Sequence, residues 1–291
     1  MPIPIPDALE ESANLARTKA VQVRRLPRYA VASAMAGAYV GVAVVVLVSV
    51  AGPLAATGSS ATRLVQSAVF GVALTLVVFA GAELFTGNVM YMLQGLQART
   101  VRTADLVVVW TASLIGNLVG SIGFAAMVNA GGTLAGGAKG GGPGPGEALV
   151  ASIVDAKNAA TGTQLFWRSG LCNMLVCLAL WMAGRTKSDA AKLVVLWWAL
   201  LAFIASGFEH SVANMTTFGL GIFEGSASWS DLWRNLAFTV PGNVVGGGLL
   251  VGVVYGWVGR PEHPVTIAPE PIPEPAVDAP LADLVEQPAP A

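Results

Sequence analysis

Six apolar segments, separated by shorter polar stretches, follow one another along the chain. They lie near 30–50, 64–93, 104–128, 165–183, 191–222 and 235–257. A helix needs about 20 predominantly apolar residues to cross the hydrocarbon core of a bilayer, and each segment approaches or exceeds that length. The pattern therefore predicts an all-α integral membrane protein with six transmembrane helices.

A repeat relates the two halves of this pattern. Gly81, Glu83, Asn88, Gly116, Asn117 and Gly120 recur 126 positions later as Gly207, Glu209, Asn214, Gly242, Asn243 and Gly246. Each half contains three crossings, so the second half begins on the opposite side of the membrane from the first. We therefore expect an inverted three-plus-three repeat whose equivalent elements meet near mid-depth, where substrate sites form in such proteins.

Glycine and polar residues interrupt the second and fifth segments, which are also the longest. The interruptions read AGAELFTGNVM and ASGFEHSVANM. Because lipid cannot satisfy backbone groups that a break sets free, a broken helix is tolerated only where it is buried in protein or lines a cavity. The pattern predicts broken helices two and five beside a transport path. A continuous kinked helix with packed glycines is the alternative.

Composition agrees with a membrane protein and excludes one class of partner. The 291 residues are 54% hydrophobic and 11% charged, with a mean hydropathy of +0.65, whereas about 25% of the residues of soluble domains are charged. The lipid bilayer is therefore the expected surrounding. The net charge of −1 gives no basic excess to neutralise phosphates, so nucleic acid is not an expected partner.

Lysine and arginine residues flank the segments unevenly. One side has eleven of them: Arg17, Lys19, Arg24, Arg25, Arg28, Arg99, Arg102, Arg185, Lys187, Lys192 and Arg260. The other side has five: Arg63, Lys139, Lys157, Arg168 and Arg234. By the positive-inside rule, this imbalance predicts a multi-pass protein with both its N- and C-termini in the cytoplasm.

Two terminal segments flank the expected transport domain of residues 30–258. Residues 1–29 predict a cytoplasmic amphipathic helix that opens with Asp7 and Glu10 as a capping box. Residues 259–291 are rich in proline, alanine and acids, which predicts a disordered cytoplasmic tail.

Two further stretches carry structural expectations. The glycine-rich connection 131–147 is not expected to hold regular structure. Cys172 and Cys177 are five residues apart in an apolar run, a spacing that puts them on different faces of a helix, so we expect packed thiols rather than a disulfide.

Of the two histidines in the sequence, His210 lies in an apolar segment and His263 lies in the tail. A histidine at mid-membrane is costly unless it faces a cavity, which makes His210 the candidate for chemistry. A neutral histidine hydrogen-bonded within the bundle is the alternative.

The repeated polar residues have a structural interpretation. Glu83 and Glu209 stand next to the two breaks, where freed N–H groups favour a carboxylate, so bracing of each broken helix is favoured over proton relay. Asn117 and Asn243, within G-N-x-x-G, are typical of helix contacts with one hydrogen-bonding amide. Asn88 and Asn214 belong to the same repeat-supporting set.

The stretches AGAELFTGNV, GNLVGS, CNMLVCLALWM, LLAFIASGFEHSVANMT and GNVVGGGLLVGVVY together resemble the formate/nitrite transporter family. The resemblance covers about residues 30–257. It implies an aquaporin-like protomer in a homopentamer that conducts small monovalent anions, here across a bacterial cytoplasmic membrane.

Matching positions imply roles for nine residues. The resemblance implies that His210 is the central pore histidine, that Asn173 and Thr86 hydrogen-bond near it, and that Lys157 draws anions toward it. It further implies a movable gating loop that contains Leu84, Phe85 and Thr86. The cytoplasmic constriction would be formed by Leu74, Leu84 and Phe85, and the external one by Phe70 and Phe203.

A transport hypothesis follows from one histidine between two apolar constrictions. A bare anion is costly to move through them, whereas a weak acid that gains a proton at or near His210 crosses as a neutral molecule. The competing version keeps His210 as a hydrogen-bond donor or cation in a passive channel.

Nitrite is the favoured anion, with formate or hydrosulfide as alternatives within the family. In a different class, an aquaporin-like channel for neutral solutes fits the six spans, but the NPA pairs expected there are missing from the sequence. An enzyme is not expected, because the sequence has neither H-E-x-x-H nor G-x-S-x-G. No catalytic residue, metal site or cofactor is therefore expected.

Overall fold

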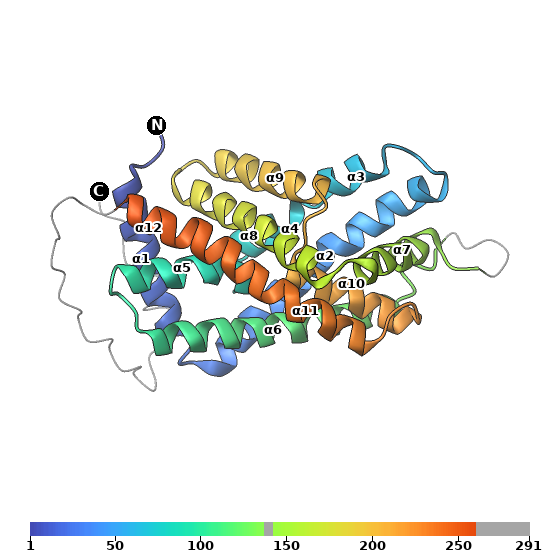
Figure 1. Cartoon of the computed structure of the whole chain (residues 1–291), viewed down its shortest axis with the longest axis horizontal. Helices are drawn as coiled ribbons and strands as arrows, with labels where there is room; N and C mark the ends of the chain where they lie inside the picture. Colours follow the sequence, from blue (N-terminus) through green and yellow to red (C-terminus); the bar gives the residue numbers. More distant parts are fainter. Residues whose placement is uncertain (137–141, 260–291) are drawn as a thin grey trace.

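The computed structural model describes residues 1–136 and 142–259, and this part of the chain is a bundle of helices (Figure 1). The first half contains α1 (Ile5–Gln22), α2 (Leu26–Ala56), α3 (Thr62–Val69), α4 (Val72–Phe79), α5 (Phe85–Gln97) and α6 (Thr103–Ala130). The second contains α7 (Pro145–Ala159), α8 (Gly162–Gly184), α9 (Asp189–Ala205), α10 (Ser211–Glu224), α11 (Trp229–Asn243), the π-helix η1 (Val244–Val253) and α12 (Val254–Val258). The predicted tail lies outside the described residues, apart from Gly259.

Five stretches within the described residues are helical, long and apolar enough to cross a membrane. They are Leu26–Ala56, Thr62–Phe79, Thr103–Ala130, Gly162–Gly184 and Trp229–Val258. The fifth predicted segment, 191–222, is divided between α9 and α10. The prediction of an all-α membrane protein is confirmed, and six complete crossings stay a prediction.

Both predicted helix breaks are present. The first separates α4 from α5 and the second separates α9 from α10. Gly81 and Gly207 begin these breaks with φ angles of +73° and +71°. This left-handed conformation strains residues that carry a Cβ, which explains why both copies of the repeat have glycine here. An additional interruption at Phe70 and Gly71, which the sequence did not predict, separates α3 from α4.

The side chain of Asn117 satisfies backbone groups at the first break. Its Oδ1 accepts from the N–H of Phe85 at 2.9 Å, and its Nδ2 donates to the carbonyls of Glu83 at 2.9 Å and Ser33 at 2.7 Å. Asn117 is buried, so it replaces the water that these groups would otherwise need.

Asn243 does the same at the second break. Its Oδ1 accepts from the N–H of Ser211 at 3.0 Å, and its Nδ2 donates to the carbonyls of Glu209 at 3.2 Å and Ser169 at 2.8 Å. The repeated asparagines therefore hold each break against the two neighbouring long helices.

The glycines of the G-N-x-x-G motifs permit this close helix contact. A Cβ on Gly120 of α6 would overlap the carbonyl oxygen of Ala34 in α2, and a Cβ on Gly246 of η1 would overlap that of Gly170 in α8. Small residues let helix backbones approach in this way. The α2–α6 and α8–η1 contacts are thus equivalent in the two halves.

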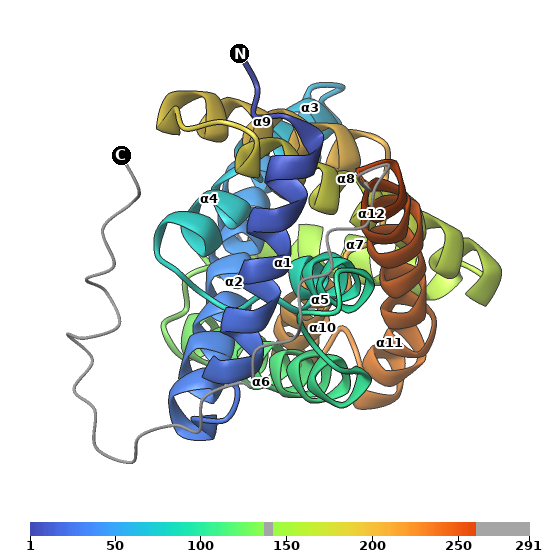
Figure 2. The same ribbon diagram turned by 90° about the vertical axis from the view of Figure 1, so that its left-hand side faces the viewer.

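Contacts near the N-terminus show which helix ends lie together (Figure 2). The N–H of Ile3 donates to the carbonyl of Arg185 after α8, and the hydroxyl of Thr100 before α6 donates to the carbonyl of Ala13 in α1. Gly259, after α12, contacts Ile5. The start of α6 and the ends of α8 and α12 therefore share one end of the bundle with α1.

Two local expectations need correction, and one feature was not predicted. Helix α1 begins at Ile5, and its N-cap residue is Pro4, which has no side-chain acceptor. Asp7 therefore lies in the first turn of the helix, and the predicted capping box of Asp7 and Glu10 is wrong. The connection 131–147 was expected to be irregular, but its last residues form the first turn of α7, where Glu147 accepts from the N–H of Gly144. The sequence also gave no indication of η1, in which the last apolar segment changes from α- to π-helix.

Candidate functional site

His210 is the N-cap residue of α10, at the second break. Its Nδ1 accepts a hydrogen bond from the N–H of Ala213 at 3.1 Å. The proton of a neutral imidazole must then sit on Nε2, which lies 3.1 Å from the hydroxyl oxygen of Thr86. His210 therefore donates to Thr86 across the two halves of the chain.

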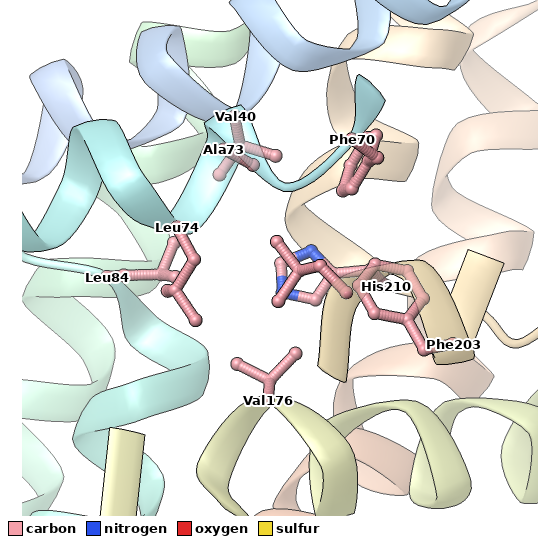
Figure 3. Close-up of a pocket in the computed structure, with 9 residues that line it drawn as sticks. Val40, Phe70, Ala73, Leu74, Leu84, Val176, Phe203 and His210 are labelled. Atoms are coloured by element: carbon pink, nitrogen blue, oxygen red, sulfur yellow. The ribbon is translucent and has the colours of Figure 1, made fainter. Parts of the chain in front are cut away.

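A small cavity of about 10 Å³ lies beside His210, with room for about one water-sized group. It is lined by Val40, Phe70, Ala73, Leu74, Leu84, Val176, Leu200, Phe203 and His210. Figure 3 shows the imidazole next to Phe203, facing Leu74 and Leu84. His210 supplies the polar side chain of this otherwise apolar lining.

Four of the five residues expected to form constrictions line this cavity. Phe70 meets Phe203 edge to face at 5.5 Å between ring centroids, and Phe203 stacks against His210 at 6.1 Å. Leu74 and Leu84 line the cavity as well. Phe85 is buried, but it is not among the residues that line the cavity. The break instead uses its backbone N–H, which donates to Asn117.

The side-chain amide of Asn173 contacts the backbone carbonyl of Thr86, not its hydroxyl. Its Nδ2 donates to the carbonyl of Thr86 at 3.1 Å and to that of Asn243 at 2.7 Å. Both Asn173 and Thr86 are fully buried. One amide of α8 therefore joins the start of α5, in the first half of the chain, to the end of α11, in the second half.

Lys157, at the end of α7, forms an ion pair next to the second break. Its Nζ lies 2.6 Å from Oε2 of Glu209, and the two side chains are 13% and 7% exposed. The amide of Asn214 also donates to this oxygen, at 2.8 Å, and to Oδ1 of Asn235. Lys157 is therefore held by a carboxylate directly before His210 in the chain.

Lys19 of α1, which the sequence interpretation treated only as a flanking cation, makes the equivalent pair at the first break. Its Nζ lies 2.8 Å from both carboxylate oxygens of Glu83. Tyr29 and Asn88 also donate to Glu83, at 3.2 and 3.1 Å. A signal was present, because Lys19 follows the buried Ala16 by three residues and so shares its face of α1. Nothing in the sequence indicated its partner.

Among the residues that the structure describes, no three or more histidine, cysteine, aspartate or glutamate side chains are grouped so that they could bind a metal ion. The polar groups of the site are instead paired with one another and with backbone groups at the breaks.

Comparison with known proteins agrees with this architecture. The family model described as formate/nitrite transporter matches residues 6–257. The nitrite transporter NirC of Escherichia coli is 40% identical over 255 residues, covering 86% of this chain and 90% of NirC. A probable formate transporter of Methanothermobacter thermautotrophicus is 37% identical, covering 79% of this chain and 88% of its own length.

Solved structures have the same fold. One, an FNT family ion channel, superposes with a TM-score of 0.80 at 38% identity and covers 88% of this chain and 99% of its own. Another, a pentameric formate channel with formate bound, gives a TM-score of 0.65 at 27% identity and covers 81% and 98%.

Proposed function

The chain belongs to the formate/nitrite transporter family, and we propose that within it this protein conducts a small monovalent weak-acid anion, nitrite first of all. The 40% identity to a nitrite transporter over most of both chains supports this choice of anion. Formate is the second candidate, because relatives at 37% and 34% identity are named a probable formate transporter and a formate channel.

The observation that carries the proposal is the single imidazole in an apolar cavity. Phe70 and Phe203 lie on one side of it and Leu74 and Leu84 on another. Removing an anion from water into such surroundings without compensation is costly. A weak acid avoids this cost by crossing as a neutral molecule, and Lys157 and the donors around Thr86 attract its anion beforehand.

The hydrogen bonds of His210 define what proton transfer requires. A second proton can enter only at Nδ1, which now accepts from Ala213. Protonation at Nδ1 would break this bond and place a positive charge at the N-terminus of α10, where the helix dipole disfavours it. In the relay version, the imidazole therefore leaves Ala213 as it takes up its proton; in the passive version, it stays neutral and only donates from Nε2.

Two replacements of His210 distinguish these versions in proteoliposomes that take up nitrite or formate with and without a pH gradient. Phenylalanine removes the donor and the titratable group. Asparagine keeps a good N-cap acceptor and a donor but does not titrate. A relay loses its pH response in both variants, whereas a donor-only channel keeps it in His210→Asn. Uptake of neither anion by the wild-type protein would contradict the proposed function.

The same proposal includes assembly and orientation. The likeness to a pentameric channel supports a homopentamer in a bacterial cytoplasmic membrane, with no enzymatic activity. At the repeat offset of 126, α6 corresponds to the continuous stretch of α11, η1 and α12. The start of α6 and the end of that stretch both lie next to α1, which supports an inverted repeat. Both termini then face the cytoplasm, residues 1–29 form the peripheral segment, and residues 259–291 form the tail.

A further inference from the structure

We propose that Cys177 is a positioning residue for transport: with Asn173 it fixes the carbonyl of Thr86 and so keeps the Thr86 hydroxyl against His210. This inference deepens the proposed function and rests on it. It gives a role to a thiol that the sequence pattern indicated only as apolar filling.

The thiol lies inside the hydrogen-bond network of the site. Its Sγ is 3.3 Å from the carbonyl oxygen of Thr86 and 3.7 Å from Oδ1 of Asn173. A thiol has one hydrogen to donate, and the carbonyl is the closer acceptor. Since Cys177 and Asn173 are four residues apart on α8, they share a face of that helix and reach the same carbonyl together.

Thr86 depends on these contacts because of its position. It is the second residue of α5, directly after the first break. No helical turn precedes it to hold its backbone in place. Two donors from α8 hold its carbonyl, and its hydroxyl then lies 3.1 Å from Nε2 of His210. A small rotation of this turn would change the distance between the hydroxyl and the imidazole.

A glycine of the π-helix η1 packs closely against the thiol. A Cβ on Gly247 would overlap Nδ2 of Asn173 and lie 2.6 Å from Sγ of Cys177. Cys177 itself is fully buried. Because Gly247 lies close to both Asn173 and Cys177, η1 restricts the movement of these two side chains.

Cys172 provides a matched control on the same helix. It is also free and fully buried, but it makes no hydrogen bond among the described residues. Cys172→Ala and Cys177→Ala each remove one buried sulfur atom and leave cavities of similar size. The difference between them isolates the contact with Thr86, and Cys177→Ser tests rescue by a residue that still donates.

The experiment measures nitrite and formate uptake by proteoliposomes across a range of pH, together with thermal melting of the protein. Cys177→Ala is expected to change the nitrite-to-formate ratio about two- to tenfold, the range that losing one modest hydrogen bond corresponds to, and to shift the pH profile. Cys177→Ser and Cys172→Ala should keep wild-type ratios and profiles. Equal ratios and profiles in both alanine variants would overturn the inference.

An infrared measurement separates failure of this inference from failure of the proposed function. In Cys172→Ala, the S–H stretching band comes from Cys177 alone. If added nitrite or formate shifts this band, the thiol senses the anion near Thr86, whether or not transport is detected. An unchanged band at saturating concentrations of both anions would overturn the positioning role.

Discussion

At the scale of single residues, the ion pair of Lys157 with Glu209 allows a direct test of a buried charge pair. Both side chains are mostly buried, and removing one partner leaves an unpaired charge, which destabilises proteins by about 3–5 kcal/mol. Lys157→Met should therefore lower the melting temperature strongly. Lys157→Met combined with Glu209→Gln should recover most of the loss, because the double variant leaves no unpaired charge at this position.

Uptake by the double variant tests the role of the lysine separately from folding. If Lys157 attracts the anion, nitrite uptake stays low although the protein melts like the wild type. A double variant that melts as early as the single one would contradict the stabilising pair, and full uptake would contradict the attraction.

The sequence named candidate polar residues, but not how they bond. In the structure, His210 lines a cavity and lies 3.1 Å from the Thr86 hydroxyl, and Asn173 donates to the Thr86 carbonyl. The roles in transport that the resemblance implies for these residues stay predictions. The tautomer of His210 could not be predicted, because it depends on which residue begins α10. Cys177 was missed because a thiol in an apolar run usually packs without a hydrogen-bond partner.

At the scale of helices, two glycines of α6 allow a matched test of close contact. A Cβ on Gly120 would overlap the carbonyl of Ala34, whereas a Cβ on Gly123 meets nothing within 4 Å. Gly123→Ala should be neutral or stabilise by up to about 1 kcal/mol through helix propensity. Gly120→Ala should separate α2 from α6 and lower the melting temperature by several degrees.

Thermal melting in detergent, followed by circular dichroism, compares these two variants directly. Similar melting temperatures would show that α2 and α6 can separate at no cost and would contradict the need for glycine at position 120.

Element boundaries were predictable where a chemical requirement repeats and unpredictable where it does not. Gly81 and Gly207 need positive φ angles, so both breaks stood out in the sequence. The interruption at Phe70 and the change to π-helix after Asn243 occur within uniformly apolar runs, where hydrophobic periodicity does not vary. Helix α7 was not predicted, because its apolar residues follow a glycine-rich stretch and are too few to suggest a membrane crossing.

At the scale of the whole molecule, the charged residues separate between the two ends of the bundle. Arg185 contacts Ile3, and Thr100, next to Arg99 and Arg102, contacts α1. These cations therefore gather at the end that holds the N-terminal helix. From the positive-inside rule we propose that this end faces the cytoplasm and that the opposite end, with residues 57–61, faces the external side.

Cysteine labelling on intact cells tests this orientation. Lys187 and Ser60 are exposed, near opposite ends, and the native thiols of Cys172 and Cys177 are buried. A membrane-impermeant maleimide should label Ser60→Cys on intact cells and Lys187→Cys only after permeabilisation, with the wild-type protein as the unlabelled control. The reverse pattern would contradict the orientation. Labelling of both positions on intact cells would contradict the odd number of crossings between them, because three crossings must place residues 60 and 187 on opposite sides.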